Sequence, residues 1–159
     1  MLKALLKSIL SSPIYDVAKI TPLDCLEQFS LTCDNKVYLK REDLQPIHSF
    51  KIRGAYHKMI QLSNKQRQGG VVAASAGNHA QGVAYGAQQL GIKATIFMPI
   101  TTPDIKVTAV KGFGAEVFLH GDSYDDAYTK ALAYSKKKKR VFIHPFDDMD
   151  VIAGQGTLA

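Results

Sequence analysis

The chain has 159 residues, with 20 basic and 14 acidic side chains, a formal net charge of +6 and a hydrophobic content of 46%. That length suits one domain rather than a large multidomain protein, since domains commonly run to about 100–150 residues. The apolar content excludes a compositionally disordered chain, and the sequence lacks the roughly 18 consecutive apolar residues that span a membrane. We therefore expect a soluble globular protein that does not act at a membrane.

The N-terminal segment is the first predicted element. Residues 1–10 read MLKALLKSIL, an apolar stretch interrupted by Lys3 and Lys7. No small-residue cleavage pattern follows it, so an amphipathic helix is favoured over a secretion signal, with a short organellar presequence as the alternative. Cys25 and Cys33 are too few for a secreted disulfide framework and have no companion pair for a zinc site. We expect two reduced thiols in a cytoplasmic protein, and no metal site.

A short strand and an amphipathic helix come next. Residues 37–40 have the pattern of a strand, and Ser49 can cap the helix that follows. The apolar residues of that helix recur at helical spacing: Ile52, Ala55, Tyr56, Met59 and Ile60.

From residue 71 onward, short apolar runs alternate with helical patterns. The runs predict buried strands at residues 71–74, 94–97, 116–119 and 141–143. The helices between them are marked by an apolar face (Ala80, Val83, Ala84 and Ala87), by Thr102-Pro103-Asp104 at a helix start, and by Ser123 as a cap. Alternation of this kind builds right-handed crossovers, so we predict an α/β fold in which a parallel sheet has helices on both faces. Gly91, Gly112 and Gly114 fall at helix exits, where a left-handed residue is needed.

Much of the positive charge lies in one run, KKKKR at residues 136–140. Such a run can bind nucleic acid. However, residues 123–137 have helical spacing with Asp125 and Asp126 in the first turn, so lysines in the last turn would complement the helix dipole. Because no aromatic residues interleave the run and no nucleic-acid motif accompanies it, we favour a solvated helix end and expect no nucleic-acid partner.

Two segments are candidates for chemistry, because ligands of open α/β sheets bind where helix N-termini point their free amides. The first, SAGNHAQG at residues 75–82, directly follows a predicted strand. Gly77 lets the backbone approach a ligand closely, and its neighbours Ser75, Asn78 and His79 suit a carboxylate or a phosphate. A plain strand-to-helix turn would use the same residue types, so both interpretations stand.

The second segment contains Lys51, in the first turn of its predicted helix. The helix dipole disfavours a cation at this end, where Asp or Glu would be the ordinary choice. The same positive field would lower the pKa of the amine, and a lysine of lowered pKa is the type that forms a Schiff base. The alternative is an exposed lysine without a role.

Together these segments resemble a known family. Residues 40–55, KREDLQPIHSFKIRGA, and residues 75–82 resemble the threonine dehydratases, pyridoxal-phosphate enzymes of the tryptophan-synthase-β type, also termed fold type II. The resemblance is closest to the biosynthetic branch, also called threonine deaminase, and it extends over residues 15–159. Further stretches support it: QPIH at 45–48, MP at 98–99, DIKV at 104–107, FGAEV at 113–117 and IAGQGT at 152–157.

The resemblance implies a role for each candidate residue. Lys51 would form the Schiff base with pyridoxal 5'-phosphate, Phe50 would lie against one face of the cofactor ring, and Asn78 would hydrogen-bond its phenolic oxygen. The substrate carboxylate would be held by Ser75, Gly77, Asn78 and His79, although His79 could equally be a capping or core histidine. The implied reaction converts L-threonine to 2-oxobutanoate and ammonia, the first step of isoleucine biosynthesis, with Lys51 as the base that takes the Cα proton.

The resemblance also implies what lies elsewhere in the family. The glycine-rich phosphate loop and the residue at the pyridine nitrogen fall downstream of the position that matches Ala159. We therefore predict the N-terminal fragment of a longer enzyme, inactive by itself, with homo-oligomers (tetramers in the family) only for a full-length chain. Its expected divisions are residues 1–42, the start of the large cofactor domain; 43–147, the small α/β domain; and 148–159, a return into the large domain that ends where a helix begins.

Several alternatives stay open at this stage. The chain could be an inactive remnant or an interaction module, a dehydratase that prefers serine, or a basic α/β domain that binds nucleotide or nucleic acid. Four further histidines form no metal-ligand spacing, and we assign them no role: His48, His57, His120 and His144. Residues 154–157, GQGT, resemble a phosphate cradle, but the family resemblance makes them the entry to a helix.

Overall fold

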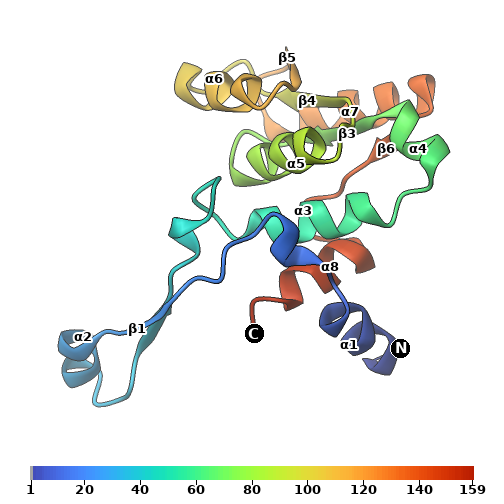
Figure 1. Ribbon diagram of the computed structural model, residues 1–159. Helices are drawn as coiled ribbons and strands as arrows, with labels where there is room; N and C mark the ends of the chain where they lie inside the picture. Colours follow the sequence, from blue (N-terminus) through green and yellow to red (C-terminus); the bar gives the residue numbers. More distant parts are fainter. Residues whose placement is uncertain (1) are drawn as a thin grey trace.

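The computed structural model describes residues 2–159, so Met1 of the predicted N-terminal helix lies outside the described residues (Figure 1). Its central feature is a parallel sheet of four strands in the order β5-β4-β3-β6. The strands are β3 (Val71–Ala74), β4 (Ala94–Met98), β5 (Glu116–Leu119) and β6 (Val141–Phe142). In β3 and β4 every residue is buried, as expected for central strands of a sheet that is covered on both sides.

Helices cover both faces of this sheet, which confirms the predicted α/β fold. On one face lie α5 (Asn78–Gln89) and α6 (Asp104–Gly112), and on the other lies α7 (Tyr124–Lys138) (Figure 1). The core under α5 and α6 is built from small and branched apolar side chains, among them Ala80, Val83, Ala84, Ile96 and Val110. The core under α7 joins Ala127 and Ala131 to Val72, Ala74 and Phe97.

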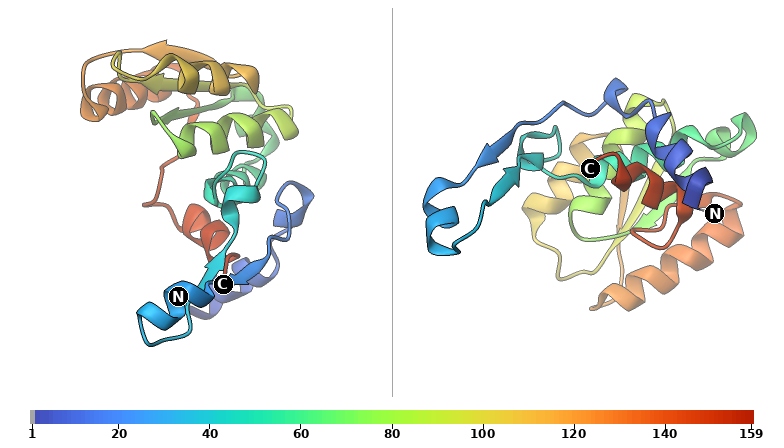
Figure 2. Two further views of the ribbon diagram at one scale, coloured as in Figure 1. Left: turned by 90° about the vertical axis from the view of Figure 1, so that its left-hand side faces the viewer. Right: turned by 90° about the horizontal axis from the view of Figure 1, so that it is seen from below.

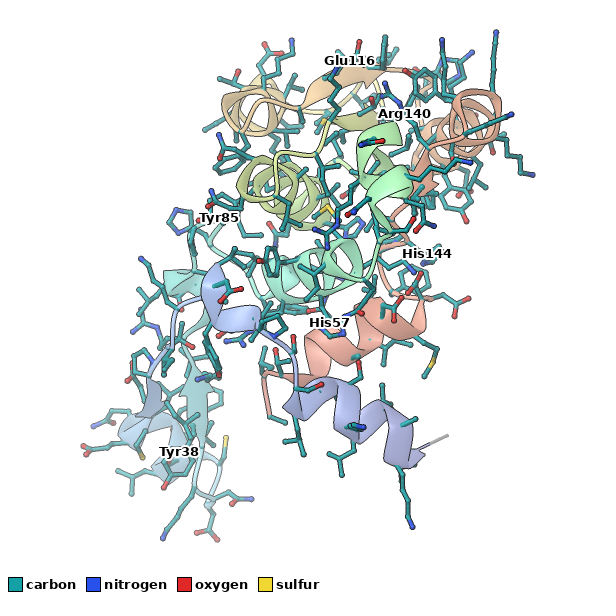
Figure 3. All side chains as sticks on the ribbon, turned by 45° about the vertical axis from the view of Figure 1, so that its right-hand side comes forward. Tyr38, His57, Tyr85, Glu116, Arg140 and His144 are labelled. Atoms are coloured by element: carbon teal, nitrogen blue, oxygen red, sulfur yellow. The ribbon has the colours of Figure 1, made fainter. Side chains whose placement is uncertain are left out.

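A second layer of helices lies beyond α5. It contains α3 (Lys51–Ile60), α8 (Met149–Gly156) and α1 (Leu2–Leu10), stacked in that order away from the sheet (Figures 1 and 3). The contacts of α3 with α5 and α8 are close because glycines meet backbone on both sides of it. A Cβ atom on Gly82 of α5 would lie 2.9 Å from the carbonyl oxygen of Lys51, and one on Gly154 of α8 would lie 2.5 Å from that of Arg53.

A slender arm extends away from the helices (Figures 1 and 2). It consists of β1 (Leu23–Cys25), α2 (Glu27–Thr32) and β2 (Tyr38–Lys40), with β1 and β2 paired antiparallel. Short helical turns at Ile14–Asp16 and Glu42–Leu44 flank the arm, and α4 (Asn64–Gly69) joins α3 to β3. Both cysteines lie on the arm as free, exposed thiols. No helix of the described residues is long and apolar enough to cross a membrane.

Most predicted elements are confirmed, several with shifted ends. Ser123 caps α7 through a reciprocal capping box with Asp126, and lysines occupy the last turn of α7. Gly91 and Gly114 have positive φ angles, of 65° and 80°. The strand predicted at residues 37–40 is β2, and the strand predicted at 141–143 is β6; each is one residue shorter than predicted.

Four predictions about local structure are wrong. Ser49 is not the cap of α3, because Phe50 occupies that position and no side chain of residues 2–159 caps the helix. The Ser49 hydroxyl instead accepts a hydrogen bond from the Lys51 amide N–H at 3.3 Å. The strand at 116–119 is an exposed edge strand rather than a buried one, since only β4 pairs with it. Gly112 is the last residue of α6 and has no positive φ.

The fourth concerns residues 154–157, which do not open a helix. They lie at the end of α8, which begins at Met149 and is capped by Asp148 through its carboxylate. Sequence reasoning missed this start because the capping Asp148 stands in an acidic stretch, DDMD, in which several residues could act as the cap.

Candidate functional site

The helix α3 places Lys51 in its first turn, as predicted. The Lys51 amine donates a hydrogen bond to the carbonyl oxygen of Pro145, 3.1 Å away, in the segment between β6 and α8. It also lies 5.4 Å from the centre of the Phe50 ring. The Phe50 side chain is 40% exposed, so an aromatic face next to the amine is open to a ligand.

The pKa of the Lys51 amine is lowered, in the predicted direction. Burial is the cause: it removes water from the ammonium form and thereby favours the neutral amine. A larger neutral fraction at physiological pH makes this amine a better nucleophile and base than an exposed lysine.

Residues 75–77 connect β3 to α5, and together with Asn78 and His79, the first two residues of α5, they form the segment called here the loop 75–79. Its backbone is held by Ser75, whose hydroxyl accepts the amide N–H of Gly77 at 3.1 Å. Gly77 precedes the first residue of α5, and no side chain among the described residues caps this helix. A Cβ atom on Gly77 would meet no heavy atom within 4 Å, so the space above the helix start is open. An uncapped helix start with open space above it suits an anion such as a carboxylate.

His79 lies beneath this loop rather than in the open space. Its side chain is almost fully buried, and its Nε2 is 3.0 Å from the carbonyl oxygen of Ile143. Because a carbonyl oxygen can only accept, Nε2 carries the proton and Nδ1 is the bare nitrogen. Nδ1 is buried and has no hydrogen-bond partner among residues 2–159. Of the two interpretations of His79, this geometry favours the core histidine, which ties α5 to the end of β6.

The burial of His79 predicts acid sensitivity. Burial lowers the pKa of His79 from 6.5 to about 4, so the unfolded chain takes up a proton at higher pH than the folded chain does. Its contribution to stability is therefore complete above pH 6.5 and is lost as the pH falls toward about 4. The full effect is on the order of 3 kcal/mol. Urea unfolding of the wild type and of His79→Gln, in which residue 79 does not titrate, will measure this contribution of His79 to the free energy of unfolding between pH 6.5 and about 4. Equal losses of stability in the two proteins as the pH falls would contradict the prediction.

A buried ion pair anchors the other side of α3, and sequence reasoning missed it. The guanidinium of Arg53 donates to both carboxylate oxygens of Glu42, at 2.8 and 2.9 Å, and both side chains are buried. Thr21 and Gln45 donate further hydrogen bonds to the same carboxylate. Burial alone would raise the pKa of Glu42, but the hydrogen bonds from Arg53, Thr21 and Gln45 outweigh it and lower that pKa. The pair joins α3 to the short helical turn before it, and because Glu42 and Arg53 do not share one helix or strand, the spacing of residues along a single element does not indicate it.

The two candidate segments lie at the same end of two packed helices. The Lys51–Ile52 peptide contacts Gly82 of α5, and Tyr56 and Met59, further along α3, contact Gly86, further along α5. The two helices therefore run in the same direction, with Lys51 and the loop 75–79 at their N-terminal ends. The positive charge of Lys51 also contributes to the lowered pKa of His79, after burial.

The comparison with known proteins decides the family. The family model described as pyridoxal-phosphate dependent enzyme matches residues 14–159. The chain belongs to this family. The match includes Lys51 and the loop 75–79, together with every strand of the parallel sheet.

The relatives that this pyridoxal-phosphate-dependent chain matches are considerably longer than the chain itself. It is 56% identical over 154 residues to the L-threonine dehydratase biosynthetic IlvA of Pasteurella multocida, covering 97% of this chain and 30% of that protein. It is 53% identical to the Escherichia coli protein of the same name, with the same coverage. The solved structure of the processed form of threonine deaminase isoform 2 from Solanum lycopersicum has a TM-score of 0.95 and 50% identity, over 99% of this chain and 43% of that one.

The described residues fit pyridoxal phosphate. The cofactor carries an aldehyde, an aromatic ring and anionic oxygens, and it reacts with a neutral amine. The structure offers a partly buried amine on Lys51, an open aromatic face on Phe50, and the uncapped start of α5. Among residues 2–159, no group of three or more His, Cys, Asp or Glu side chains is placed so that it could hold a metal ion.

Proposed function

We propose that this chain supplies the reactive lysine and the carboxylate-binding loop of a threonine dehydratase, an enzyme that converts L-threonine to 2-oxobutanoate and ammonia in the first step of isoleucine biosynthesis. The observation that carries the proposal is the position of the Lys51 amine, partly buried beside the open ring of Phe50 and at the same end as the uncapped start of α5. The identity of 56% to a protein named L-threonine dehydratase supports the choice of substrate.

Each proposed site residue has a physical role toward cofactor or substrate. Lys51 would hold pyridoxal phosphate covalently, and the ring of Phe50 and the amide of Asn78 would contact it. When bound, the cofactor supplies an electron sink that makes the Cα proton of an amino acid acidic. The Lys51 amine would take that proton, which requires its neutral form, and burial increases the neutral fraction.

The loop 75–79 would hold the substrate carboxylate. Amide N–H groups at the start of α5 can donate to both carboxylate oxygens, and the helix dipole adds a favourable field. A carboxylate held at two points fixes the direction of the Cα–H bond relative to the base, which lowers the entropic part of the barrier. His79 would act here as a support under the loop, through its hydrogen bond to Ile143.

Loss of the Ser75 hydroxyl should weaken substrate binding. Ser75→Ala removes the acceptor that holds the Gly77 N–H, so the loop becomes less ordered before it binds the carboxylate. In a full-length chimera, in which this chain replaces the matched segment of the Pasteurella multocida protein, we expect the KM for L-threonine to rise about tenfold, with a smaller change in kcat. The matched control is Ser63→Ala, which removes an exposed cap of α4 far from the site and should leave KM unchanged. Equal KM values for Ser75→Ala and Ser63→Ala would contradict this role.

The remaining expectations about the whole protein are also proposals. The proposed division is residues 1–42, which include the arm; 43–147, which include the sheet and the helices that cover it; and 148–159, which include α8. The chain spans only 30% of the length of the curated relatives it matches. We propose a cytoplasmic enzyme that forms homo-oligomers as a full-length chain. Because the matched relatives are longer, we expect the 159-residue chain alone to retain cofactor weakly and to show no turnover.

A chimera tests the proposed function in a full-length context. In it, this chain replaces the matched segment of the Pasteurella multocida protein, and formation of 2-oxobutanoate from L-threonine is compared with that of the parent enzyme. We expect comparable turnover with L-threonine and slower formation of pyruvate from L-serine. A chimera that folds and binds pyridoxal phosphate but forms no 2-oxobutanoate would overturn the proposal, and a faster reaction with L-serine would reassign the substrate.

A further inference from the structure

The contact between Gly82 and the backbone of Lys51 is unusually close for two helices. A Cβ atom on Gly82 would lie 2.9 Å from the Lys51 carbonyl oxygen, 3.1 Å from the carbonyl carbon and 3.3 Å from the Ile52 nitrogen. All three atoms belong to one peptide group, which therefore occupies the space that a side chain at position 82 would need. Because backbone in a helix cannot rotate away as a side chain can, any larger residue at position 82 must push the start of α3 away from α5.

Gly82 also stands one helical turn after Asn78. Residues four apart lie on the same face of a helix, about 6 Å apart along its axis. The same short stretch of α5 therefore carries the end of the carboxylate loop and the surface on which the reactive lysine rests. From these contacts we infer that Gly82 is a positioning residue, which sets the separation between the Lys51 amine and the loop 75–79. This inference rests on the proposed function.

On its opposite side, α3 is packed closely against α8, which leaves α3 little room to move. A Cβ atom on Gly54 would lie 2.8 Å from the carbonyl oxygen of Val151 in α8, and one on Gly154 would lie 2.7 Å from the Cα of Gly54. The helix that carries Lys51 is thus held between two neighbours at backbone contact. If a larger residue at position 82 pushes the start of α3, α8 cannot move aside to accommodate the shift, so the shift changes the position of Lys51.

Gly86 provides a matched control on the same helix. It lies one further turn along α5 and also faces α3, but a Cβ atom there would meet the terminal methyl of Met59 at 2.6 Å and the Tyr56 Cα at 3.6 Å. A methionine side chain is flexible and can move aside. Gly86→Ala thus adds the same methyl group to the same interface without pressing on backbone at the lysine.

The test uses the 159-residue chain and the reactivity of its lysine. Wild type, Gly82→Ala and Gly86→Ala are incubated with pyridoxal phosphate and reduced with borohydride, and the adduct on Lys51 is quantified by mass spectrometry across a range of pH. We expect Gly82→Ala to lower the rate of adduct formation about tenfold and to move its apparent pKa upward, toward that of an exposed lysine. Gly86→Ala should retain the wild-type rate within about twofold and the wild-type apparent pKa.

The outcomes separate this inference from the proposed function. If the wild type forms no adduct on Lys51, the proposed function fails. If the wild type forms it and Gly82→Ala matches the wild type in rate and apparent pKa, the positioning role fails, and a loss shared equally by Gly82→Ala and Gly86→Ala overturns it as well.

A second pair of variants serves if circular dichroism shows that Gly82→Ala does not fold. Two of the fully buried residues of α3 are Ile52, next to Lys51, and Met59, near the other end of the helix. Ile52→Val loosens the contact next to the lysine, whereas Met59→Leu alters the core at a distance from it. The positioning role predicts slower adduct formation for Ile52→Val alone; equal rates for the two would overturn it.

Discussion

Replacing Lys51 with alanine is expected to abolish 2-oxobutanoate formation by the chimera, with a loss of at least about a thousandfold. The change removes both the amine that would hold the cofactor and the base that would take the Cα proton, and a positioned base alone contributes about 10²–10⁴-fold. The measurement is the steady-state rate with L-threonine at saturating pyridoxal phosphate.

The matched control removes the amine of an exposed lysine that lies away from the candidate site. Lys65 is exposed on α4, away from Phe50 and the loop 75–79, and Lys65→Ala should retain the activity of the unmodified chimera. Activity of Lys51→Ala within about tenfold of the unmodified chimera would show that another group performs the chemistry. Circular dichroism of both variants separates loss of chemistry from loss of fold.

The largest effect on stability is expected at the buried ion pair. Glu42→Gln keeps the shape of the side chain but removes the charge, which leaves the guanidinium of Arg53 buried without a counter-charge. Breaking a buried pair in this way costs about 3–5 kcal/mol, a large part of the 5–15 kcal/mol that stabilises a typical domain. The measurement is the free energy of unfolding of the 159-residue chain in urea at neutral pH.

An exposed ion pair next to it in sequence is the control. Arg41 is paired with Asp24 and Asp43 at 2.9 Å, but these side chains are a third to a half exposed. Solvent screens such a pair, so Arg41→Gln should cost no more than about 1 kcal/mol. If Glu42→Gln and Arg41→Gln cost the same, the buried network does not stabilise the position of α3.

The sheet and its helices could be predicted from the sequence because their signals are local. Apolar runs at regular intervals indicated the strands, and the Ser123 capping box indicated the start of α7. The arm gave weaker signals, since β1 and β2 are three-residue strands whose side chains are mostly exposed. The edge position of β5 was not predictable, because an apolar run indicates a strand but not how many neighbours it has.

The candidate site was predictable where its chemistry depends on residue type. A lysine in the first turn of a helix and a Ser-Gly-Asn-His loop after a strand are visible in the sequence. The contacts of these residues with distant segments are not. The carbonyl group of Pro145 meets the Lys51 amine across 94 positions, and Ile143 meets His79 across 64. Gly82 closes the SAGNHAQG segment, but its contact with Lys51 was not predictable, since a glycine within a helix is explained only by the neighbour that lies against it.

The most direct test of the account is to locate the lysine that bonds pyridoxal phosphate. The 159-residue chain is incubated with the cofactor, reduced with borohydride and digested, and the modified peptide is sequenced by mass spectrometry. We predict a single main adduct on Lys51, formed faster than on any exposed lysine and absent from Lys51→Ala. An adduct distributed evenly over the exposed lysines, with no preference for Lys51, would contradict it.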